Sequence, residues 1–436
     1  MADSDTIFAL STPPGRSALA VFRMSGPQAQ RVLQAMTKRP CPQPRVATLM
    51  SLCDPKDDSK LDDAVVTFYS GPASYTGEDT LELSVHGGRG VVSAVASALS
   101  RMEDVRAAEP GEFTRRAYRA GKFDLSQAEA IADLIDSETE FQRRQALRLL
   151  AGGLGSKAEA WRQRLLALAA ELESALDFSD EGDVGALDAT SLSIRTRQLA
   201  SEIAVELELG QRSLKVREGF TVVIAGPPNA GKSTLFNRIA GSELAIVTEH
   251  AGTTRDLLKV NLDLDGVPVT LVDSAGMRAS SDPVERIGIK RAREAVGSSD
   301  LVLWLNTGDA ESIEEIEGPV LQVWSKADLF PQRKWPLAVA ANDIESIGRL
   351  VEIIREQALA IAGDGSQGLV GRQRHVIALE NAIAGLERMD RCVSEDQLEL
   401  AAEEGRMVNR QFATLSGAFE TEELLGEIFS RFCVGK

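Results

Sequence analysis

Aromatic residues, cysteines and long hydrophobic runs are all scarce in this chain of 436 residues. Aromatic side chains make up 5% of the residues, so we expect cores built mainly on leucine, alanine, valine and isoleucine. No CxxC pair occurs among the four cysteines, which are Cys41, Cys53, Cys392 and Cys433. This spacing argues against a disulfide scaffold and against a zinc site, and it favours a reducing compartment.

Signals for secretion or membrane insertion are missing as well. No apolar run approaches the roughly 18 residues that a membrane span needs. The first residues, 1–5, are acidic and lack the positively charged region with which a signal peptide begins. We therefore expect a cytoplasmic protein that does not associate with a membrane.

Positive charge is in short supply. The chain has 48 Lys and Arg residues against 65 Asp and Glu residues, a net charge of −17. Because phosphate contacts dominate nucleic-acid affinity, the chain as a whole is a poor candidate for tight, direct nucleic-acid binding. One local basic patch consists of Arg115, Arg116, Arg119 and Lys122. A solvated helix face and a binding surface explain this patch equally well.

The length predicts several domains, and the sequence pattern changes along the chain. Residues 1–122 alternate short apolar runs with Pro and Gly turns, which indicates mixed α/β structure. Residues 123–217 show the three- and four-residue spacing of helices. Residues 218–362 alternate strand and helix, as a parallel sheet requires, and helical spacing returns in residues 363–436. The simplest architecture is an α/β multidomain protein in which a discontinuous α-helical domain receives an inserted α/β domain.

The most informative segment is residues 226–233, which read G-P-P-N-A-G-K-S and match G-x-x-x-x-G-K-S. An apolar, β-branched run precedes this segment and a helical pattern follows it, the context that a phosphate-binding loop requires. Gly226 and Gly231 let backbone N–H groups wrap a polyphosphate, and the helix behind adds its positive dipole end. We expect Lys232 to reach the β- and γ-phosphates and the Ser233 hydroxyl to bind Mg²⁺.

Two downstream motifs complete the phosphate and magnesium site of a G protein. In G-T-T-R-D at residues 252–256, Thr254 is the best candidate for the second Mg²⁺ hydroxyl. A strand then ends in D-x-x-G at residues 273–276. We expect Asp273 to hold Mg²⁺ and the Gly276 amide to contact the γ-phosphate. At this distance after a phosphate-binding loop, the combination is a strong signal for a Ras-like P-loop GTPase domain.

Base choice depends on residues 325–328, S-K-A-D, which follow another strand and stand where N-K-x-D is the familiar form. The Asp328 carboxylate suits the N1–H and 2-amino groups of guanine, whereas adenine would leave this carboxylate unpaired. Ser325 replaces the usual asparagine, and this departure puts affinity in question more than base identity.

Two parts of the hydrolytic machinery cannot be found in the sequence. Ras-like proteins orient the attacking water with a glutamine directly after D-x-x-G, but this chain has Met277 there. No arginine finger can be identified. We expect both contributions to come from elsewhere.

The chain resembles, over its whole length, the MnmE/TrmE family of tRNA-uridine modification GTPases of bacteria. The most specific matches are the phosphate-binding loop, G-T-T-R-D and the C-terminal C-V-G-K at residues 433–436. Further agreement lies in residues 12–16, 23–26, 75–79, 86–88, 110–113 and 133–136.

The resemblance implies that paired G domains use K⁺ in place of an arginine finger. Asn229 would bind this K⁺, and residues 248–253 would enclose it, with Thr248, His250 and Thr253 as the implied ligands. Glu285 would act through a water to orient the nucleophile. The alternatives are that Asn229 shapes the turn and that Glu285 starts a helix. The full set of expected nucleotide-binding residues is Asn229, Ala230, Gly231, Lys232, Ser233, Thr234, Thr248, Thr254, Asp273, Gly276, Ser325, Lys326 and Asp328.

The resemblance also implies a folate-binding N-terminal domain that forms a constitutive homodimer. There, 5,10-methylene- or formyl-tetrahydrofolate would lie against Arg23, Glu82 and Lys122. The alternative is that these residues form structural salt bridges. The thiolate of Cys433 would serve as nucleophile or base, although a lone cysteine is usually inert.

Taken with its family, the chain is expected to be a K⁺-stimulated GTPase that works with an FAD-dependent partner of the MnmG/GidA type. Together they would install an aminomethyl or carboxymethylaminomethyl group at C5 of the tRNA wobble uridine. The folate would supply the carbon, glycine or ammonia would supply the nitrogen, and the partner would make most tRNA contacts. The rival hypotheses are a regulatory GTPase in ribosome assembly or signalling, and a scaffold whose nucleotide site is inactive, which Ser325 would favour.

Overall fold

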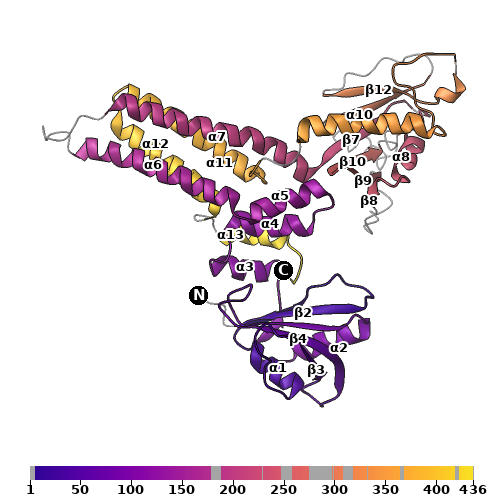
Figure 1. The fold of residues 1–436 in the computed structure, drawn as a ribbon, viewed down its shortest axis with the longest axis vertical. Coiled ribbons are helices and arrows are strands. Elements are labelled where there is room, and N and C mark those ends of the chain that lie inside the picture. The colour runs from indigo at the N-terminus through magenta and orange to yellow at the C-terminus, as the bar shows by residue number, and fades with distance from the viewer. Residues whose placement is uncertain are drawn as a thin grey trace, which may run out of the picture. The chain divides into compact units, whose positions relative to one another are not determined.

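A computed structural model of the chain describes residues 5–177, 188–227, 229–246, 258–273, 297, 299–307, 318–330, 332–363, 368–417 and 422–435. The chain divides into two compact units, residues 1–132 with 412–436, and residues 133–411. The predicted α/β multidomain class is confirmed, with two separate sheets and an extended helical region (Figure 1). None of the helices in the described part combines the length and the hydropathy of a membrane span.

The first unit is built on a six-stranded sheet with the order β3-β4-β5-β2-β1-β6. Neighbouring strands run antiparallel except β1 and β6, which are parallel. The strands are β1 (Thr6–Leu10), β2 (Leu19–Ser25), β3 (Thr48–Cys53), β4 (Lys60–Tyr69), β5 (Thr80–His86) and β6 (Val105–Ala107). Successive side chains alternate between the faces of a strand. One face carries the main core, and the β1 part of the other face is covered by Ala108 and Phe113.

Helices α1 (Ala29–Thr37) and α2 (Arg89–Ser100) cover the buried face of this sheet. Phe22, Val66 and Leu83 lie in their shared core, whereas Arg23 and Glu82 point to the opposite face. Helix α3 (Glu112–Arg119) follows β6, and helix α4 (Leu125–Ile135) leads toward the second unit.

The last 25 residues, 412–436, lie in the same compact unit as residues 1–132. Helix α13 (Glu422–Ser430) packs beside α3 and the start of α4. Leu125, Phe429 and Phe432 are buried together there, so apolar burial joins this C-terminal segment to the first unit. The predicted domain limits all stay predictions.

The helical region of the second unit contains α5 (Glu140–Leu150), α6 (Gly153–Asp177), α7 (Ala189–Glu218), α11 (Gln373–Ser394) and α12 (Leu398–Ser416). Helices α6, α7, α11 and α12 run alongside one another (Figure 1). Trp161, Leu165 and Leu168 form the buried stripe of α6, as their spacing predicts. The α/β domain is inserted between α7 and α11, and so the chain leaves and re-enters the helical region through these two helices.

The inserted domain has a six-stranded sheet with the order β12-β11-β7-β10-β9-β8. The first four strands in this order are parallel, and β9 and β8 are antiparallel additions at one edge. Helices α8 and α10 pack against the sheet. The bounds are β7 (Phe220–Ala225), α8 (Lys232–Ala240), β8 (Ala245–Ile246), β9 (Leu258–Leu264), β10 (Val267–Asp273), β11 (Leu301–Asn306), β12 (Val320–Trp324) and α10 (Ile344–Ala362).

The β9–β10 hairpin rests on the helical region. Its two-residue turn is Asp265-Gly266, in which both residues have positive φ, as a type I′ turn requires. A Cβ on Gly266 would lie 2.6 Å from the Phe141 ring. Asn261 also donates a 2.9 Å hydrogen bond to Glu138. The sheet of the inserted domain is therefore in direct contact with the start of α5.

Candidate functional site

The loop between β7 and α8 has the backbone that a phosphate-binding loop needs. Strand β7 is the buried centre of the parallel strands, and its carboxyl end leads into Gly226. Gly226 has a φ of +139°, and a Cβ there would lie 2.5 Å from the Leu305 carbonyl oxygen, so only glycine fits. Gly231 has a φ of +87° directly before α8 begins. The loop thus joins a helix N-terminus to the carboxyl edge of the sheet, where nucleotides bind in open α/β folds.

The first two residues of α8 carry the polar chemistry of this loop. The Lys232 ammonium donates hydrogen bonds of 2.9 Å to the carbonyl oxygens of both Gly226 and Pro227 and so folds back over the loop. Ser233 donates a 2.7 Å hydrogen bond to Oδ2 of Asp273. Asp273 ends β10, which pairs with β7, and is 2% exposed. A hydroxyl and a carboxylate are the hard oxygen ligands that Mg²⁺ prefers, so the Ser233–Asp273 pair fits a magnesium ion.

A cavity of about 230 Å³ lies beside the start of α8. Since one water molecule needs only about 10–15 Å³ on the same measure, this cavity has room for a ring system. Its lining residues are Gly231, Thr234, Leu235, Leu305, Ser325, Lys326, Asp328, Leu329, Val339 and Ala341. Lys326 has a φ of +55° and turns the chain into the short 3₁₀ helix η1 (Ala327–Leu329), which contains Asp328. The structure therefore brings S-K-A-D to the same cavity as the phosphate-binding loop.

Ser325, the residue that departs from the N-K-x-D pattern, faces the phosphate-binding loop. It is 7% exposed and follows the last residue of β12. Its hydroxyl donates a 2.6 Å hydrogen bond to the carbonyl oxygen of Ala230 and lies 3.2 Å from that of Asn306. Ser325 therefore connects residues 325–328 to the loop and to the end of β11.

Several predicted residues lie outside the described residues. They are Thr248, His250, Thr253, Thr254, Gly276, Met277 and Glu285. The second Mg²⁺ hydroxyl, the loop around K⁺ and the water-orienting carboxylate therefore stay predictions. Of the expected K⁺ ligands, Asn229 is described, and it stands in the phosphate-binding loop with a φ of +62°.

A second predicted group lies on the outer face of the N-terminal sheet. Arg23 and Glu82 are directly opposite each other across β2 and β5. The Arg23 guanidinium donates to Oε1 of Glu82 at 2.8 Å from Nη2 and at 3.2 Å from Nε. The two side chains are 24% and 28% exposed, so the pair is accessible although partly buried. The structure thus brings together two of the three residues expected at the folate site.

Two tyrosines that the sequence reasoning did not assign complete this group. The Tyr69 hydroxyl donates a 3.4 Å hydrogen bond to Oε2 of Glu82, and the Tyr75 ring lies 5.4 Å from the guanidinium carbon of Arg23. Burial and the neighbouring Glu82 carboxylate raise the pKa of Tyr69, so its hydroxyl stays protonated. Tyr75 belongs to a motif noted in the sequence, whereas Tyr69 could have been found only from the alternation of buried and outward residues along β4.

Lys122, the third expected folate residue, meets this group through a loop. Within the described residues its ammonium donates to the Pro72 carbonyl, and no hydrogen bond or ion pair joins it to Arg23 or Glu82. Pro72 belongs to the same loop as Tyr75, whose ring is 5.6 Å from that of Phe123. Arg23 and Lys122 therefore contact the same loop, residues 70–79, at different points.

Both explanations of the basic patch are wrong for Arg116. This side chain is buried in α3 at 4% exposure, so it belongs neither to a solvated helix face nor to a binding surface. Its guanidinium donates to Glu112 at 3.0 Å, to Asp5 at 2.8 Å and to Glu78 at 3.2 Å. Burying the Arg116 charge without these carboxylates would cost much free energy. Arg116 therefore has a structural role inside the N-terminal domain, where it links three acidic residues.

Glu112, in the motif at residues 110–113, is the centre of this internal network and is fully buried. Arg106 donates two hydrogen bonds to it, at 2.6 and 2.8 Å, and the Glu109 amide donates a third. Burial by itself would raise the pKa of Glu112, but these hydrogen bonds and the Arg116 guanidinium hold that pKa below its ordinary value. Glu112 is therefore ionised at neutral pH and fixes the turn that starts α3.

Cys433 stands in the C-terminal segment that follows α13, and it is exposed. Its carbonyl oxygen lies 3.4 Å from the donating Gly111 amide, and Val434 forms an isolated antiparallel bridge with Pro110. The backbone on either side of the thiol is thus attached to the turn that Glu112 organises. The structure gives the predicted thiol an accessible and defined place on the N-terminal domain.

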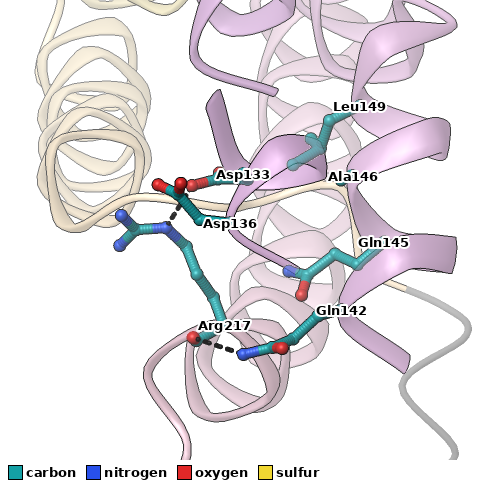
Figure 2. A pocket seen from close by; sticks show the side chains of 7 residues that line it. All are labelled: Asp133, Asp136, Gln142, Gln145, Ala146, Leu149 and Arg217. Atoms are coloured by element: carbon teal, nitrogen blue, oxygen red, sulfur yellow. Dashed lines mark hydrogen bonds and ion pairs between the residues drawn. The ribbon is translucent and has the colours of Figure 1, made fainter. Parts of the chain in front are cut away.

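Figure 2 shows a smaller, polar cavity where the chain passes between the helical region and the inserted domain. Asp133, from the motif at residues 133–136, accepts hydrogen bonds from Arg217 at 3.0 Å and from Arg372 at 2.8 Å. Arg217 is near the end of α7 and Arg372 directly precedes α11. Gln142 also donates to the Arg217 carbonyl at 3.2 Å. Asp133 therefore ties together the two connections to the inserted domain.

Comparisons with known proteins agree along the chain. Residues 6–122 match the family described as "GTP-binding protein TrmE N-terminus", and residues 125–433 match "MnmE helical domain". A tRNA modification GTPase MnmE from Beijerinckia indica is 47% identical over 99% of this chain and 96% of that protein. Another from Rhodopseudomonas palustris strain BisB5 is 44% identical over 99% of both.

Solved structures similar to this chain are less alike. The G domain of the T. maritima FeoB iron transporter is 22% identical, covering 32% of this chain and 98% of that one, with a TM-score of 0.24. Aquifex aeolicus Era bound to GDP and AlF4⁻ is 19% identical, covering 38% of this chain and 66% of that one, with a TM-score of 0.24.

Proposed function

The chain belongs to the MnmE family of tRNA modification GTPases, and we propose that it couples K⁺-stimulated GTP hydrolysis to the modification of the tRNA wobble uridine. It is a GTP hydrolase of the P-loop class. The observation on which the proposal rests is the contact between Ser233 and the buried Asp273, beside a loop whose glycines and lysine are arranged for a polyphosphate.

The nucleotide site is proposed to select guanine through Asp328. In the described part of the chain no hydrogen bond reaches the Asp328 carboxylate, which faces the cavity that begins at Gly231 and Thr234. A carboxylate accepts two hydrogen bonds from the N1–H and 2-amino groups of guanine, and adenine offers neither. The phosphates would then lie toward Lys232 and the start of α8.

The metal ions are proposed to act at the same loop. The Ser233 hydroxyl would hold Mg²⁺ directly, with Asp273 beside it, and Thr254 would supply a second hydroxyl. Asn229 would contribute an oxygen to K⁺, together with Thr248, His250 and Thr253. Bound there, the two cations supply positive charge where negative charge develops during phosphoryl transfer. Glu285 would orient the water that Met277 cannot.

The outer face of the N-terminal sheet is proposed to bind the one-carbon donor, 5,10-methylene- or formyl-tetrahydrofolate. Its ring carries amino and N–H donors on one edge, and a carboxylate such as Glu82 can accept from both. Arg23 holds Glu82 in place, and the rings of Tyr69 and Tyr75 offer flat apolar surfaces beside it. Lys122 would meet the acidic tail of the folate.

The remaining parts of the proposal concern assembly and chemistry. The exposed Cys433 thiol would act as nucleophile or base. The chain would form a homodimer and join an FAD-dependent partner of the MnmG/GidA type in the cytoplasm. With a net charge of −17, it would leave most tRNA contacts to this partner. Glycine or ammonia would supply the nitrogen of the new group at C5 of uridine.

The test is nucleoside mass spectrometry of bulk tRNA from cells that lack this chain. We expect the aminomethyl and carboxymethylaminomethyl uridines to disappear and the unmodified uridine to accumulate. The wild-type gene should restore the modified nucleosides, whereas Lys232→Ala and Cys433→Ser should not. Unchanged nucleosides in the deletion strain would contradict the proposal and favour a regulatory GTPase.

A further inference from the structure

We propose that the nucleotide site of this chain does not read N7 of guanine, because Ser325 has no hydrogen-bond donor left for the base. The proposal rests on the guanine orientation proposed above, with the N1–H and 2-amino edge on Asp328. It predicts a relaxed specificity: guanine nucleotides altered at N7 should bind as well as GDP.

The position of the Ser325 proton follows from its partners. A serine hydroxyl has one proton to donate, and its remaining capacity is to accept. Both neighbours of the hydroxyl are backbone carbonyl oxygens, those of Ala230 at 2.6 Å and Asn306 at 3.2 Å. Because a carbonyl oxygen only accepts, Ser325 must be the donor, and the shorter distance places its proton on the Ala230 carbonyl.

The hydroxyl cannot be redirected to the base without loss. Ala230 is fully buried, and in the described part of the chain its carbonyl oxygen receives no hydrogen bond except that from Ser325. A buried carbonyl without a donor carries the full penalty of its lost hydration. Ser325 itself is 7% exposed, so water does not readily replace the missing partner.

The hydrogen-bonding groups of guanine then show which atoms Ser325 cannot recognise. N7 and O6 are both acceptors, and an acceptor gains nothing from a hydroxyl that can itself only accept. An asparagine at this position would differ, because its amide has two donor protons. One could satisfy Ala230 while the other remained for the base. Residue 325 is therefore a specificity-determining position, and serine there removes one element of base recognition.

The experiment compares GDP with 7-deaza-GDP, in which N7 is replaced by C–H, by titration calorimetry on the full-length chain. We expect equal dissociation constants for the wild-type chain. Ser325→Asn should bind GDP about twofold to tenfold more tightly than 7-deaza-GDP, the range for one neutral hydrogen bond. Ser325→Thr keeps a single hydroxyl proton and should again show no preference. Thermal melting of each variant checks that it is folded.

The outcomes separate this inference from the function on which it rests. A wild-type chain that binds GDP about twofold or more better than 7-deaza-GDP overturns the inference, since a donor such as Thr234 or Lys326 would then read N7. A folded Ser325→Asn without preference also overturns it. IDP, which lacks the 2-amino group, should bind more weakly than GDP. If IDP and ADP bound as tightly as GDP, the guanine orientation on Asp328 would itself be wrong.

Discussion

The hydroxyl of Ser11 donates a 3.0 Å hydrogen bond to the carbonyl oxygen of Gly435, 424 positions further along the chain. Gly435 has a φ of +97°, and a Cβ there would lie 2.7 Å from the Leu10 carbonyl oxygen. Residue 435 therefore packs directly against the end of β1. The backbone can approach β1 this closely only because residue 435 is glycine. Cys433 stands two residues before this contact.

Gly435→Ala should release the C-terminal segment from β1. The new methyl group meets backbone, which cannot move away, and the positive φ is itself unfavourable for alanine at about 1–2 kcal/mol. We expect carboxypeptidase to remove the last residues faster than in the wild-type chain, while GTP hydrolysis is unchanged. The control is Gly426→Ala in α13, where a Cβ would meet nothing within 4 Å. Equal digestion rates for the two variants would show that the contact does not hold the segment.

Cys433→Ser should abolish tRNA modification while leaving folding and GTP hydrolysis intact. The side chain is exposed, so replacing sulfur with oxygen disturbs no packing, but a serine hydroxyl ionises far less readily than a thiol. Melting temperature, GTPase rate and modified-nucleoside content should be measured for the same variant. Modification that persists would remove the thiol from the mechanism and leave the terminal residues as a docking element.

GTP hydrolysis should require K⁺, and Na⁺ should not replace it. The motivation is Met277, where a water-orienting glutamine is absent, together with Asn229, whose side-chain oxygen can contribute to a cation site in the loop. Initial rates in KCl and NaCl at equal ionic strength provide the measurement. Equal rates in the two salts would exclude a K⁺ that acts in place of an arginine finger.

Glu285→Ala should slow hydrolysis by roughly 10²–10⁴, the effect of losing one acid–base or water-orienting group. Binding of GDP should stay nearly unchanged, because the carboxylate is proposed to act on the attacking water and not on the ground-state nucleotide. Glu285→Gln is the matched variant that retains shape without charge. A parallel fall in nucleotide affinity and hydrolysis would instead assign Glu285 a structural role.

The N-terminal domain should lose stability in acid through Glu112 and Asp5. Hydrogen bonds from Arg106 and Arg116 outweigh burial and lower the pKa of both carboxyls. A lowered folded-state pKa contributes stability that is fully present above the unfolded pKa of about 4 and is lost as the pH falls through the folded value. Glu112→Gln should lower stability at pH 7, by less than the roughly 3–5 kcal/mol of a buried charge that loses its sole partner, since Asp5 and Glu78 remain beside Arg116.

Thermal melting between pH 3 and 7 checks this expectation. The wild-type melting temperature should fall below about pH 4, and the Glu112→Gln curve should be lower and flatter because one of the responsible carboxyls is gone. An exposed pair such as Arg143 with Glu140 serves as a control, since Glu140→Gln should change stability little. Parallel curves for the wild type and Glu112→Gln would contradict the assignment.

Local chemistry explains what the sequence could predict. The strand, loop and helix from β7 through Gly226 to Lys232 could be predicted from the sequence. A β-branched run, a glycine in a turn and a helix start all depend on neighbouring residues. The buried stripe of Trp161, Leu165 and Leu168 could be predicted for the same reason, since the three- and four-residue spacing of these residues follows from helix geometry.

Contacts between segments that are far apart in the sequence could not be predicted in this way. Arg116 has the charge of a surface residue, and only the convergence of Asp5, Glu78 and Glu112 on it makes burial favourable. Tyr69 reaches Glu82 because β4 and β5 pair in one register, and a shift by one residue would turn it to the other face.

By itself, the amino-acid sequence determined the phosphate-binding loop and the candidates Ser233 for magnesium and Asp328 for guanine, because these depend on residue type at short spacing. Only the tertiary structure decided that Ser325 gives its proton to Ala230 and that Gly435 rests on β1. Both contacts join residues that are far apart along the chain. Their distances depend on how helices and strands pack together when their apolar faces are buried.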